Sequence, residues 1–470
     1  MDKQKSINLV IWNCYNNLRG KMDIVKCREN VLSMLFLKYI SDCEKEDGEA
    51  IFESLYNNRC EEDITKRVYD VLENIEKNNG ELYQDIFSSL KDILSRDRES
   101  NEIIRRLLEA FNSLDLSAEK YRSDIGNIFE SIMHEFASYA GRKGNDMFTP
   151  LEVSKLLALL LQPSENDTIY DPACGSGSTL LKIYDKAEHI KIYGQEIDES
   201  MWSLCKMNMV LHGIEDVQIW HGDTLIDPKN IIDNKLMKFQ IIVSNPPFSL
   251  QKWDKGFLKD IEVDEKGKKI KKMSASMDRW NRFSIGVPPS LKGDYAFVLH
   301  MLSCLDPDQG RMAVVLPHGV LFRGASERDI RQELIKLNVI DTVIGLPENL
   351  FYGTSIPACI LILKKKRTTD DVLFVDASNQ SEVKKVGKHR ILTDNDISHI
   401  VEAYNTRESE EQYAYVASHK EIVDNDFNLS IQRYVRSIEE EKIDTDKMKL
   451  EIEVIEKELE DVQRRLSKYL

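Results

Sequence analysis

The sequence of 470 residues has eight cysteines but no pair of them in a C-x-x-C arrangement. Scattered cysteines argue against a zinc site or a disulfide framework and are typical of reduced thiols in the cytoplasm. Long hydrophobic runs are also absent. Runs such as Leu156 to Leu161 are too short to cross a bilayer, and the N-terminal residues lack an apolar segment with a cleavage site. We therefore expect a cytoplasmic protein without a metal site that does not enter a membrane.

Positive charge is scarce as well. The chain carries 64 Lys and Arg against 80 Asp and Glu, a formal net charge of −16. A protein that binds DNA without a partner usually has a basic surface. Contact of this chain with nucleic acid would therefore need a local basic patch or a partner. One basic segment, residues 266–272, is expected either to touch phosphates or to form a solvated hairpin. Its lysines are Lys266, Lys268, Lys269, Lys271 and Lys272.

Glycine and proline are nearly absent from the first part of the chain, where only positions 20, 48 and 80 precede Gly126. These three glycines are expected to mark breaks between helices. In the segment ENVLSMLFLKYISD the apolar residues recur with the spacing of one helix face. They are Leu32, Leu35, Phe36, Tyr39 and Ile40. We predict an all-helical domain over residues 1–122, which serves as a packing unit without chemistry of its own.

Short apolar runs alternate with helical patterns over residues 123–380. The runs end in Gly, Asp or Pro turns and read TIYDPACGSGS, KIYGQEID, VQIWHGD, FQIIVSNPPF, GRMAVVLPHGV, IDTVIGLP and PACILILKK. This alternation predicts an α/β domain with a mostly parallel sheet flanked by helices. Ligands of such sheets bind beyond the carboxyl ends of the strands, so the residues directly after each run are the candidates for function.

The loop DPACGSGS follows the first of these runs. Gly175 and Gly177 would let a ligand come close to the backbone. The loop is neither the G-x-G-x-x-G dinucleotide fingerprint nor a phosphate loop with Gly-Lys-Ser/Thr. A ligand with a small charged head and no phosphates fits better, although an ordinary loop of this composition stays an alternative.

Acidic side chains follow the next two runs. Glu196 and Asp198 are placed to accept the hydroxyls of a ribose, and Asp223 to accept an adenine amino group. Ahead of the first run, the segment NDMFTP offers Phe148 as a ring wall. Each of these residues taken alone is also compatible with an exposed loop, but their order along the chain favours one nucleoside-binding pocket.

The segment IIVSNPPF ends an apolar run in an amide, two prolines and an aromatic ring. The nitrogen of an aromatic amino group is a poor nucleophile because its lone pair is delocalised into the ring. The side-chain oxygen of Asn245 and the carbonyl of Pro246 can accept its two hydrogens in fixed directions, and the prolines remove competing donors. Phe248 can lie against the base. The alternative is a plain Pro-Pro turn.

These motifs together resemble the N6-adenine DNA methyltransferases, and more narrowly the modification (M) subunits of type I restriction–modification systems. The likeness runs nearly end to end and includes LFLKYISD, FTPLEVSKLL, GDYAFVLHML, ENLFYGTSIPACILIL and NDFNLSIQRYV. It implies a Rossmann-like domain that depends on S-adenosyl-L-methionine. MDRWNRFSIGVPPSLKGDYAF resembles the connector that follows the catalytic motif in this family. The sequence departs from the family at Met147-Phe148, where an aromatic pair is commoner.

The resemblance implies roles for individual residues. The predicted catalytic residues are Asn245, Pro246, Pro247 and Phe248. The predicted cofactor-binding residues are Met147, Phe148, Thr149, Pro150, Asp171, Gly175, Ser176, Gly177, Ser178, Glu196 and Asp223. The implied partners are double-stranded DNA, a specificity (S) subunit, a second copy of this chain and a restriction (R) subunit.

The C-terminal region, residues 381–470, ends in an apolar seam with alternating spacings of three and four. It predicts a helical tail that packs on its own protein or docks on a partner subunit. Two rival functions remain from the sequence. One is a stand-alone amino-methyltransferase acting on adenine or on N4 of cytosine, and the other is a catalytically silent scaffold subunit.

Overall fold

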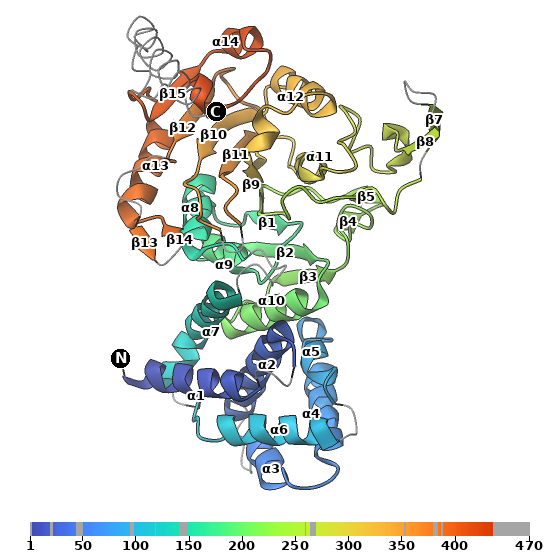
Figure 1. The fold of residues 1–470 in the computed structure, drawn as a ribbon, viewed down its shortest axis with the longest axis vertical. Coiled ribbons are helices and arrows are strands. Elements are labelled where there is room, and N and C mark those ends of the chain that lie inside the picture. The colour runs from blue at the N-terminus through green and yellow to red at the C-terminus, as the bar shows by residue number, and fades with distance from the viewer. Residues whose placement is uncertain are drawn as a thin grey trace, which may run out of the picture.

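The chain forms a helical part and a sheet part that meet along helices α7 and α10 (Figure 1). The structure is a computed structural model and describes residues 2–18, 22–43, 50–94, 98–117, 119–140, 148–258, 260–263, 269–351, 354–378, 384–386 and 389–435. The helical part comprises α1 (Asp2–Leu18), α2 (Ile24–Cys43), α3 (Ile51–Asn57), α4 (Ile64–Asn78), η1 (Glu81–Tyr83), α5 (Ser88–Lys91), α6 (Arg98–Phe111) and α7 (Glu119–Ala140).

Helix α2 is the centre of the helical part. It contacts α1, α3, α5, α6 and α7, and every residue from Cys27 to Lys38 is buried. The expectation of one apolar face was therefore too narrow, because neighbours surround this helix on all sides. Its buried Lys38 lies 2.6 Å from Asp42, whose carboxylate also accepts a hydrogen bond from the Leu116 amide. The charges of this pair on α2 are thus buried with partners, as burial of charge requires.

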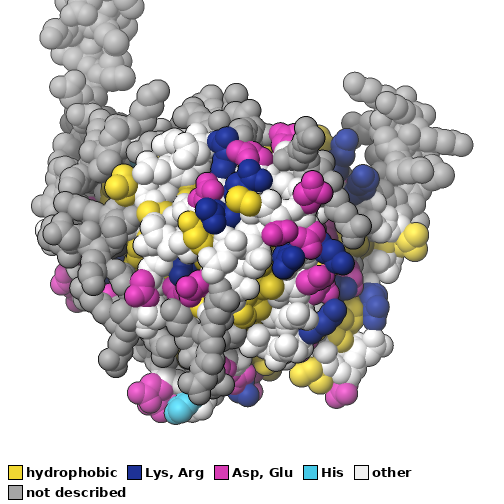
Figure 2. All heavy atoms as spheres, turned by 90° about the horizontal axis from the view of Figure 1, so that it is seen from below, with side chains coloured by type: hydrophobic (Ala, Val, Ile, Leu, Met, Phe, Trp, Pro, Cys, Tyr) yellow, Lys and Arg dark blue, Asp and Glu magenta, His cyan; other side chains and the backbone are white. Residues whose placement is uncertain are grey.

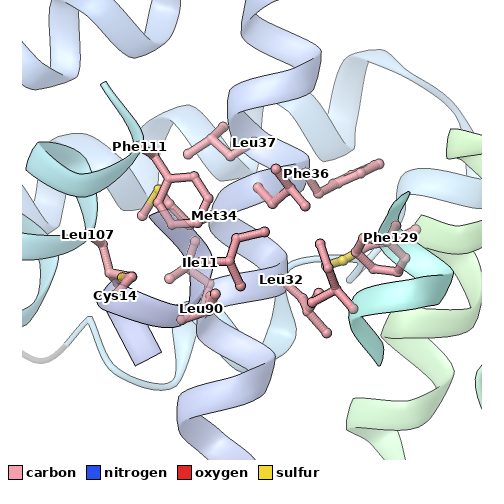
Figure 3. Packing of buried hydrophobic residues seen from close by; sticks show 14 of the residues in the cluster. Ile11, Cys14, Leu32, Met34, Phe36, Leu37, Leu90, Leu107, Phe111 and Phe129 are labelled. Carbon is pink, nitrogen blue, oxygen red and sulfur yellow. The ribbon is translucent and has the colours of Figure 1, made fainter. Parts of the chain in front are cut away.

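The remaining helices bury apolar residues in the core that surrounds α2. Helix α4 buries Ile64, Val68, Leu72 and Ile75, which recur at the helical spacing. Figure 3 shows side chains of α1, α2, α5, α6 and α7 pointing into this common core. On the face of the helical part seen in Figure 2, Lys and Arg side chains are interspersed with Asp and Glu. This face therefore offers no single basic patch among the described residues.

The sheet part is built on nine strands in the order β15-β12-β10-β11-β9-β6-β1-β2-β3. The strands are β1 (Thr168–Asp171), β2 (Lys191–Glu196), β3 (Val217–His221), β6 (Ile241–Ser244), β9 (Arg311–Pro317), β10 (Ile340–Gly345), β11 (Ala358–Lys364), β12 (Val372–Asp376) and β15 (Ala414–Ala417). Strand pairs β4 (Ile231–Ile232) with β5 (Lys235–Leu236), β7 (Asp260–Val263) with β8 (Lys269–Lys272), and β13 (Lys384–Val386) with β14 (His389–Ile391) form small hairpins.

All seven runs expected to be strands lie in the large sheet. The neighbouring strands from β3 to β9 in the sheet order pair in parallel. Strand β11 is antiparallel to both of its neighbours, β9 and β10, and the edge strand β15 is antiparallel to β12. Strands β12 and β15 were not anticipated. Helix α7 crosses the predicted boundary at residue 122, and β15 extends the sheet past residue 380. The three predicted domain ranges stay predictions.

Helices cover both faces of the sheet, so the inner strands such as β6 and β10 are buried on both sides. In β6, Ile241 and Val243 face the core under α8 (Leu151–Leu161), α9 (Ser178–Tyr184) and α13 (Asp394–Thr406). Ile242 faces the opposite core under α11 (Asp294–Cys304) and α12 (Ser326–Lys336). The other helical elements of this part are α10 (Glu199–Leu211), α14 (His419–Asp424), η3 (Ala275–Met277), η4 (His318–Leu321) and η5 (Ile431–Arg433). No helix of the described residues has both the length and the apolar composition of a membrane span.

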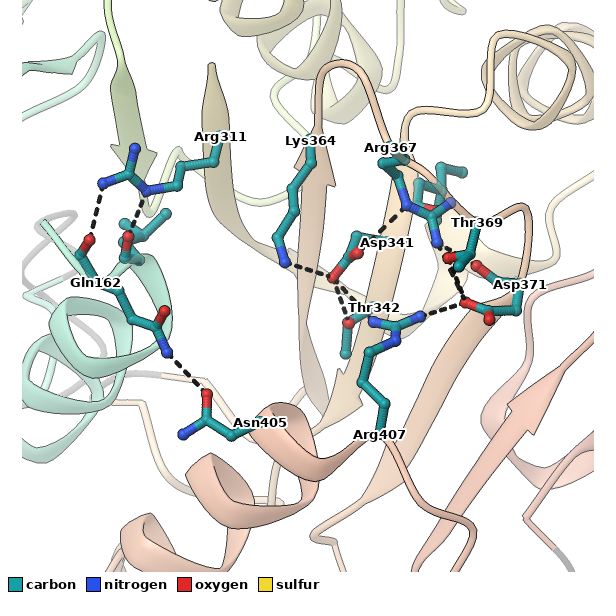
Figure 4. A network of polar contacts seen from close by, with 12 residues as sticks. Gln162, Arg311, Asp341, Thr342, Lys364, Arg367, Thr369, Asp371, Asn405 and Arg407 are labelled. Carbon is teal, nitrogen blue, oxygen red and sulfur yellow. Dashed lines mark hydrogen bonds and ion pairs between the residues drawn. The ribbon is translucent and has the colours of Figure 1, made fainter. Parts of the chain in front are cut away.

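The amino edge of the sheet carries a network of ion pairs (Figure 4). Asp341, at the start of β10, lies 3.3 Å from the side chains of Lys364, Arg367 and Arg407. Nearby, Arg311 at the start of β9 pairs with Asp167 at 2.7 Å. Carboxylates at this edge are therefore paired with cations, which is the usual condition for burying a charge.

The opposite, carboxyl edge contains the point where the strand order reverses. Strand β1 lies between β2 on one side and β6 on the other, and all three are parallel. The loops that leave β1 and β6 diverge at such a point and leave a crevice, which is where ligands of open α/β sheets bind.

Candidate active site

Two adjoining cavities lie at the carboxyl ends of β1, β2, β3 and β6. The larger cavity has a volume of about 220 Å³ and the smaller about 30 Å³. The larger is lined by Pro172, Ala173, Gly175, Glu196, Ile197, Asp198, Met201, Gly222, Asp223, Thr224, Asn245, Pro247 and Phe297. The smaller is lined by Phe148, Thr149, Asp171, Ala173, Cys174, Gly175, Ser176, Ser178, Thr179, Met201 and Asn245. The cavities share Ala173, Gly175, Met201 and Asn245, so they form one continuous site.

Asp171 joins the two loops that diverge at the reversal point. Its Oδ1 atom accepts hydrogen bonds from the Ala173 amide at 2.9 Å and from the Ser244 hydroxyl at 2.8 Å. The first bond is within the loop after β1, and the second reaches the end of β6. Burial raises the pKa of this carboxyl to about 7, although both hydrogen bonds oppose the rise. Asp171 therefore braces the site and stays partly protonated near neutral pH.

The glycine loop after β1 turns directly into helix α9. Gly177 has a φ of 79°, and a Cβ atom there would lie 2.5 Å from the Cε atom of Met209. The turn therefore requires glycine for both its backbone and its close packing on α10. Gly175 has a φ of 53° and lines both cavities, where a Cβ would meet only the Met201 side chain at 3.9 Å. A side chain at Gly175 would occupy space that the loop leaves open.

Glu196 at the end of β2 is bound to the glycine loop. Its Oε2 atom accepts from the Gly175 amide and its Oε1 atom from the Asp198 amide, both at 2.8 Å. Burial raises the pKa of this carboxyl, and the backbone amides oppose that effect. An ionised carboxylate has about four acceptor positions, so both oxygens can accept further hydrogen bonds from a ligand in the larger cavity.

Asp223 lies in the loop after β3 and lines the same cavity. Its Oδ1 atom accepts from the Leu225 amide at 2.9 Å and from the Ile226 amide at 3.3 Å, which shapes the loop. Burial raises the pKa of Asp223, and its nearby amides and Arg282 lower it. The carboxylate is half-buried, which leaves it able to meet a ligand.

Asn245 follows β6 directly and lines both cavities. Its Nδ2 atom donates to the hydroxyl of Thr149 at 3.0 Å. Its Oδ1 atom is buried and has no hydrogen-bond partner among the described residues. A buried carbonyl oxygen without a partner is costly, and such atoms in native proteins commonly mark a place where a ligand or water donates.

The other residues of the NPPF segment differ in their burial and in their contacts. Pro246 is buried, whereas Pro247 is exposed and lines the larger cavity. The Phe248 ring contacts the Phe351 ring edge-on at 5.9 Å and lines neither cavity. The next residue, Ser249, has a φ of 53°, and its amide donates to the buried carboxylate of Asp294 at 2.7 Å. This contact fastens the segment to the first turn of α11.

Comparison with known proteins identifies the family. Residues 120–443 match the N-6 DNA Methylase family, and residues 7–146 match the HsdM N-terminal domain. The MpnII type I restriction enzyme methylase subunit of Mycoplasma pneumoniae is 29% identical over 98% of this chain and 94% of its own length. The MjaVIII methylase subunit of Methanocaldococcus jannaschii is 33% identical over 77% of this chain and 63% of its own. The solved type I methyltransferase subunit from Streptococcus thermophilus has a TM-score of 0.77 and 31% identity, covering 92% of this chain and 99% of its own.

The chain belongs to the N-6 DNA methylase family. Within it, the chain is a methylase subunit of the type I restriction–modification kind, an adenine-specific DNA methyltransferase. The resemblance drawn from the motifs is therefore confirmed, as is the Rossmann-like α/β fold.

The structure of this methylase subunit brings most of the predicted site residues together. Those that line a cavity are Phe148, Thr149, Asp171, Gly175, Ser176, Ser178, Glu196, Asp223, Asn245 and Pro247. Pro150, Gly177, Pro246 and Phe248 lie beside the cavities in the same loops without lining them. Met147 falls outside the described residues. The individual roles assigned to these residues stay predictions.

Several lining residues escaped the sequence reasoning. Ile197 and Thr224 directly follow the predicted acids Glu196 and Asp223, so the strand-end rule alone points to them. Met201 and Phe297 come from helices α10 and α11 and carry no local signal of a ligand. Only the packing of those helices over the strand ends brings them to the cavity.

Two predicted features fall wholly or partly outside the described residues. The backbone of β7 and β8 forms a hairpin, but the side chains of the lysine segment 266–272 are not described. The apolar seam of the tail lies beyond residue 435, where the description ends. The proposed contacts of both segments remain predictions.

Proposed function

We propose that the two cavities bind S-adenosyl-L-methionine, and that Asn245 directs the N6 amino group of a target adenine toward it. The observation that supports this most directly is the buried Oδ1 atom of Asn245, which has no hydrogen-bond partner among the described residues and lies in a wall common to both cavities. An acceptor in that position suits a ligand that brings an N–H donor.

The residues present fit the cofactor. Gly175 leaves open the space that a Cβ would fill, and Glu196 offers acceptor positions for ribose hydroxyls. Asp223 provides an acceptor for an adenine amino group in the same cavity. S-adenosyl-L-methionine, when bound, supplies a methyl group activated by a sulfonium sulfur. Phe148, Thr149 and Pro150 would wall the pocket, with Asp171 bracing it. The loop residues Ser176, Gly177 and Ser178 complete the predicted binding set.

The orientation of the Asn245 side-chain amide would determine its role. Because Nδ2 is held by Thr149, Oδ1 is the available acceptor, and the carbonyl of Pro246 is the proposed second acceptor. Two acceptors in fixed positions draw the amino hydrogens out of the ring plane and localise the nitrogen lone pair. Phe248 would lie against a base that has left the duplex stack. Pro247 keeps the loop rigid and donates no competing hydrogen bond.

The partners follow from the charge of the chain and its family. An acidic chain with a formal charge of −16 is poorly suited to bind double-stranded DNA by itself. We therefore assign sequence reading to a specificity subunit, with a second copy of this chain and a restriction subunit in the full assembly. The lysine segment 266–272 is the proposed local contact with phosphates.

Replacement of Asn245 by alanine tests the proposal. In the complex with its specificity subunit, Asn245→Ala should lower methyl transfer by about a thousandfold or more, because fixed acceptors at the reacting group contribute on that order. Its affinity for S-adenosyl-L-methionine, measured by calorimetry, should stay close to wild type. The exposed Asn405, whose side-chain oxygen accepts a hydrogen bond from Gln162, provides a matched Asn405→Ala control with full activity.

Digestion of methylated DNA to nucleosides identifies the product. N6-methyladenine is expected, and N4-methylcytosine without N6-methyladenine would overturn the assignment of the base. A wild-type chain that binds no S-adenosyl-L-methionine would instead favour the silent scaffold. Full activity without any partner would favour a stand-alone enzyme.

A further inference from the structure

One wall of the site belongs to the core of the helical part. Phe148 is only 4% exposed and packs in the same hydrophobic cluster as α1, α2, α6 and α7, while it also lines the smaller cavity. Met201 of α10 belongs to this cluster too and lines both cavities. The core of the helical part therefore extends to the predicted cofactor site through two side chains that the sheet part contributes.

Two residues of the helical part contact the Phe148 ring. The guanidinium carbon of Arg28, on the central helix α2, lies 5.2 Å from the ring centroid, within the range of a cation–π contact. The ring of His134, on α7, stands edge-on to it with centroids 6.3 Å apart. Both residues are buried, with exposed fractions of 3% and 7%.

His134 acts here as an aromatic ring. Neither of its nitrogens has a hydrogen-bond partner among the described residues, and burial lowers its pKa to about 4, so the side chain is neutral at physiological pH. Within the described part of the chain, this side chain therefore contributes through its shape and its ring contact. Its edge against Phe148 is such a contact.

The same helix α7 is tied to the far side of the site. Its buried Glu130 accepts from Lys182 of α9 at 2.8 Å, and α9 is the helix that begins directly after the glycine loop. A Cβ at Gly126 of α7 would lie 2.6 Å from the His212 ring at the end of α10, so these two helices are in close contact. Helix α7 therefore touches the aromatic wall and both helices that frame the cavities.

We propose that Arg28 and His134 are positioning residues that hold the Phe148 ring as a wall of the cofactor pocket, so that the helical part sets the affinity for S-adenosyl-L-methionine. This inference rests on the proposed function. It assigns the helical part a task in cofactor binding that a packing unit would not have.

Calorimetric titration of the full-length chain with S-adenosyl-L-methionine tests it. Arg28→Met and His134→Ala should each raise the Kd about five- to tenfold, because each change removes one of the two ring contacts described above. His134→Phe keeps an aromatic ring and should restore a near wild-type Kd, and Arg28→Lys should restore it in part. In the assembled enzyme the KM for the cofactor should rise while kcat changes less than about twofold.

A matched control separates this role from general loss of stability. Arg59 lies over the Tyr56 ring at 4.0 Å in the same helical part, and that ring lines neither cavity. Arg59→Met should therefore leave the Kd unchanged. Wild-type Kd values in folded Arg28→Met and His134→Ala would overturn the inference, as would equal weakening by His134→Ala and His134→Phe. If Arg28→Met does not fold, the two His134 variants decide. Absence of binding to the wild-type chain would instead overturn the proposed function itself.

Discussion

The two edges of the central sheet both carry buried carboxylates, but they stabilise them differently. At the amino edge, Asp341 is paired with three cationic side chains. At the carboxyl edge, Asp171, Glu196 and Asp223 accept hydrogen bonds from backbone amides and a hydroxyl, and none of them forms an ion pair among the described residues.

The three carboxyl groups at the carboxyl edge all have raised pKa values. Burial raises the pKa of Asp171, Glu196 and Asp223, and amide hydrogen bonds only partly offset it. A carboxylate that binds several cations has few acceptor positions free for a ligand, whereas one that accepts from one or two amides keeps free acceptor positions. The amino edge therefore serves stability, and the carboxyl edge retains carboxylates for binding.

Replacement of Asp341 by asparagine gives the largest expected change. Asp341→Asn removes the carboxylate that three cationic side chains share. Two of them, Arg367 and Arg407, still pair with Asp371. The free energy of unfolding should therefore fall by about 3 kcal/mol, the lower end of the loss expected when a buried ion pair is broken. Denaturant unfolding measures this loss, and the Kd for S-adenosyl-L-methionine should stay within about twofold of wild type. A large change in Kd would show that the two edges are coupled.

The matched change at the carboxyl edge should weaken cofactor binding more than it lowers stability. Glu196→Gln removes the charge that the proposed ribose contact uses, so the Kd for S-adenosyl-L-methionine should rise about 10- to 100-fold. Its free energy of unfolding should fall by about 1 kcal/mol, because a glutamine side chain has one acceptor oxygen where Glu196 uses two, while no cation loses a partner. Calorimetry and unfolding on the same preparation check both parts. A stability loss as large as that of Asp341→Asn would contradict the comparison.

The smallest expected effect is a pH dependence. The pKa of Asp171 rises from 3.8 to about 7 on folding, so between these values the folded chain holds a proton that the unfolded chain has lost. Stability should therefore fall as pH rises through this window and stop falling above about 7. Between pH 5 and 6 the wild type should lose about 1 kcal/mol more than Asp171→Asn. Parallel pH profiles for the two proteins would rule out this titration.

The strand ends were the most predictable part of this protein. Asp171, Glu196, Asp223 and Asn245 each follow an apolar run, and parallel strands bring their carboxyl ends to one edge. The helical part was less predictable. The helical spacing of its apolar residues predicted one buried face for α2, but six neighbouring elements surround this helix, including α10 of the sheet part.

The sequence by itself determined the chemistry that the site can hold, because the residue types and their order after each strand are local properties. Only the tertiary structure decided that Met201, Phe297 and the ring neighbours Arg28 and His134 take part in or border the site. The physical reason is packing. Helices distant in sequence approach the cavity only after their apolar faces are buried against the sheet and against one another, and no local pattern encodes that approach.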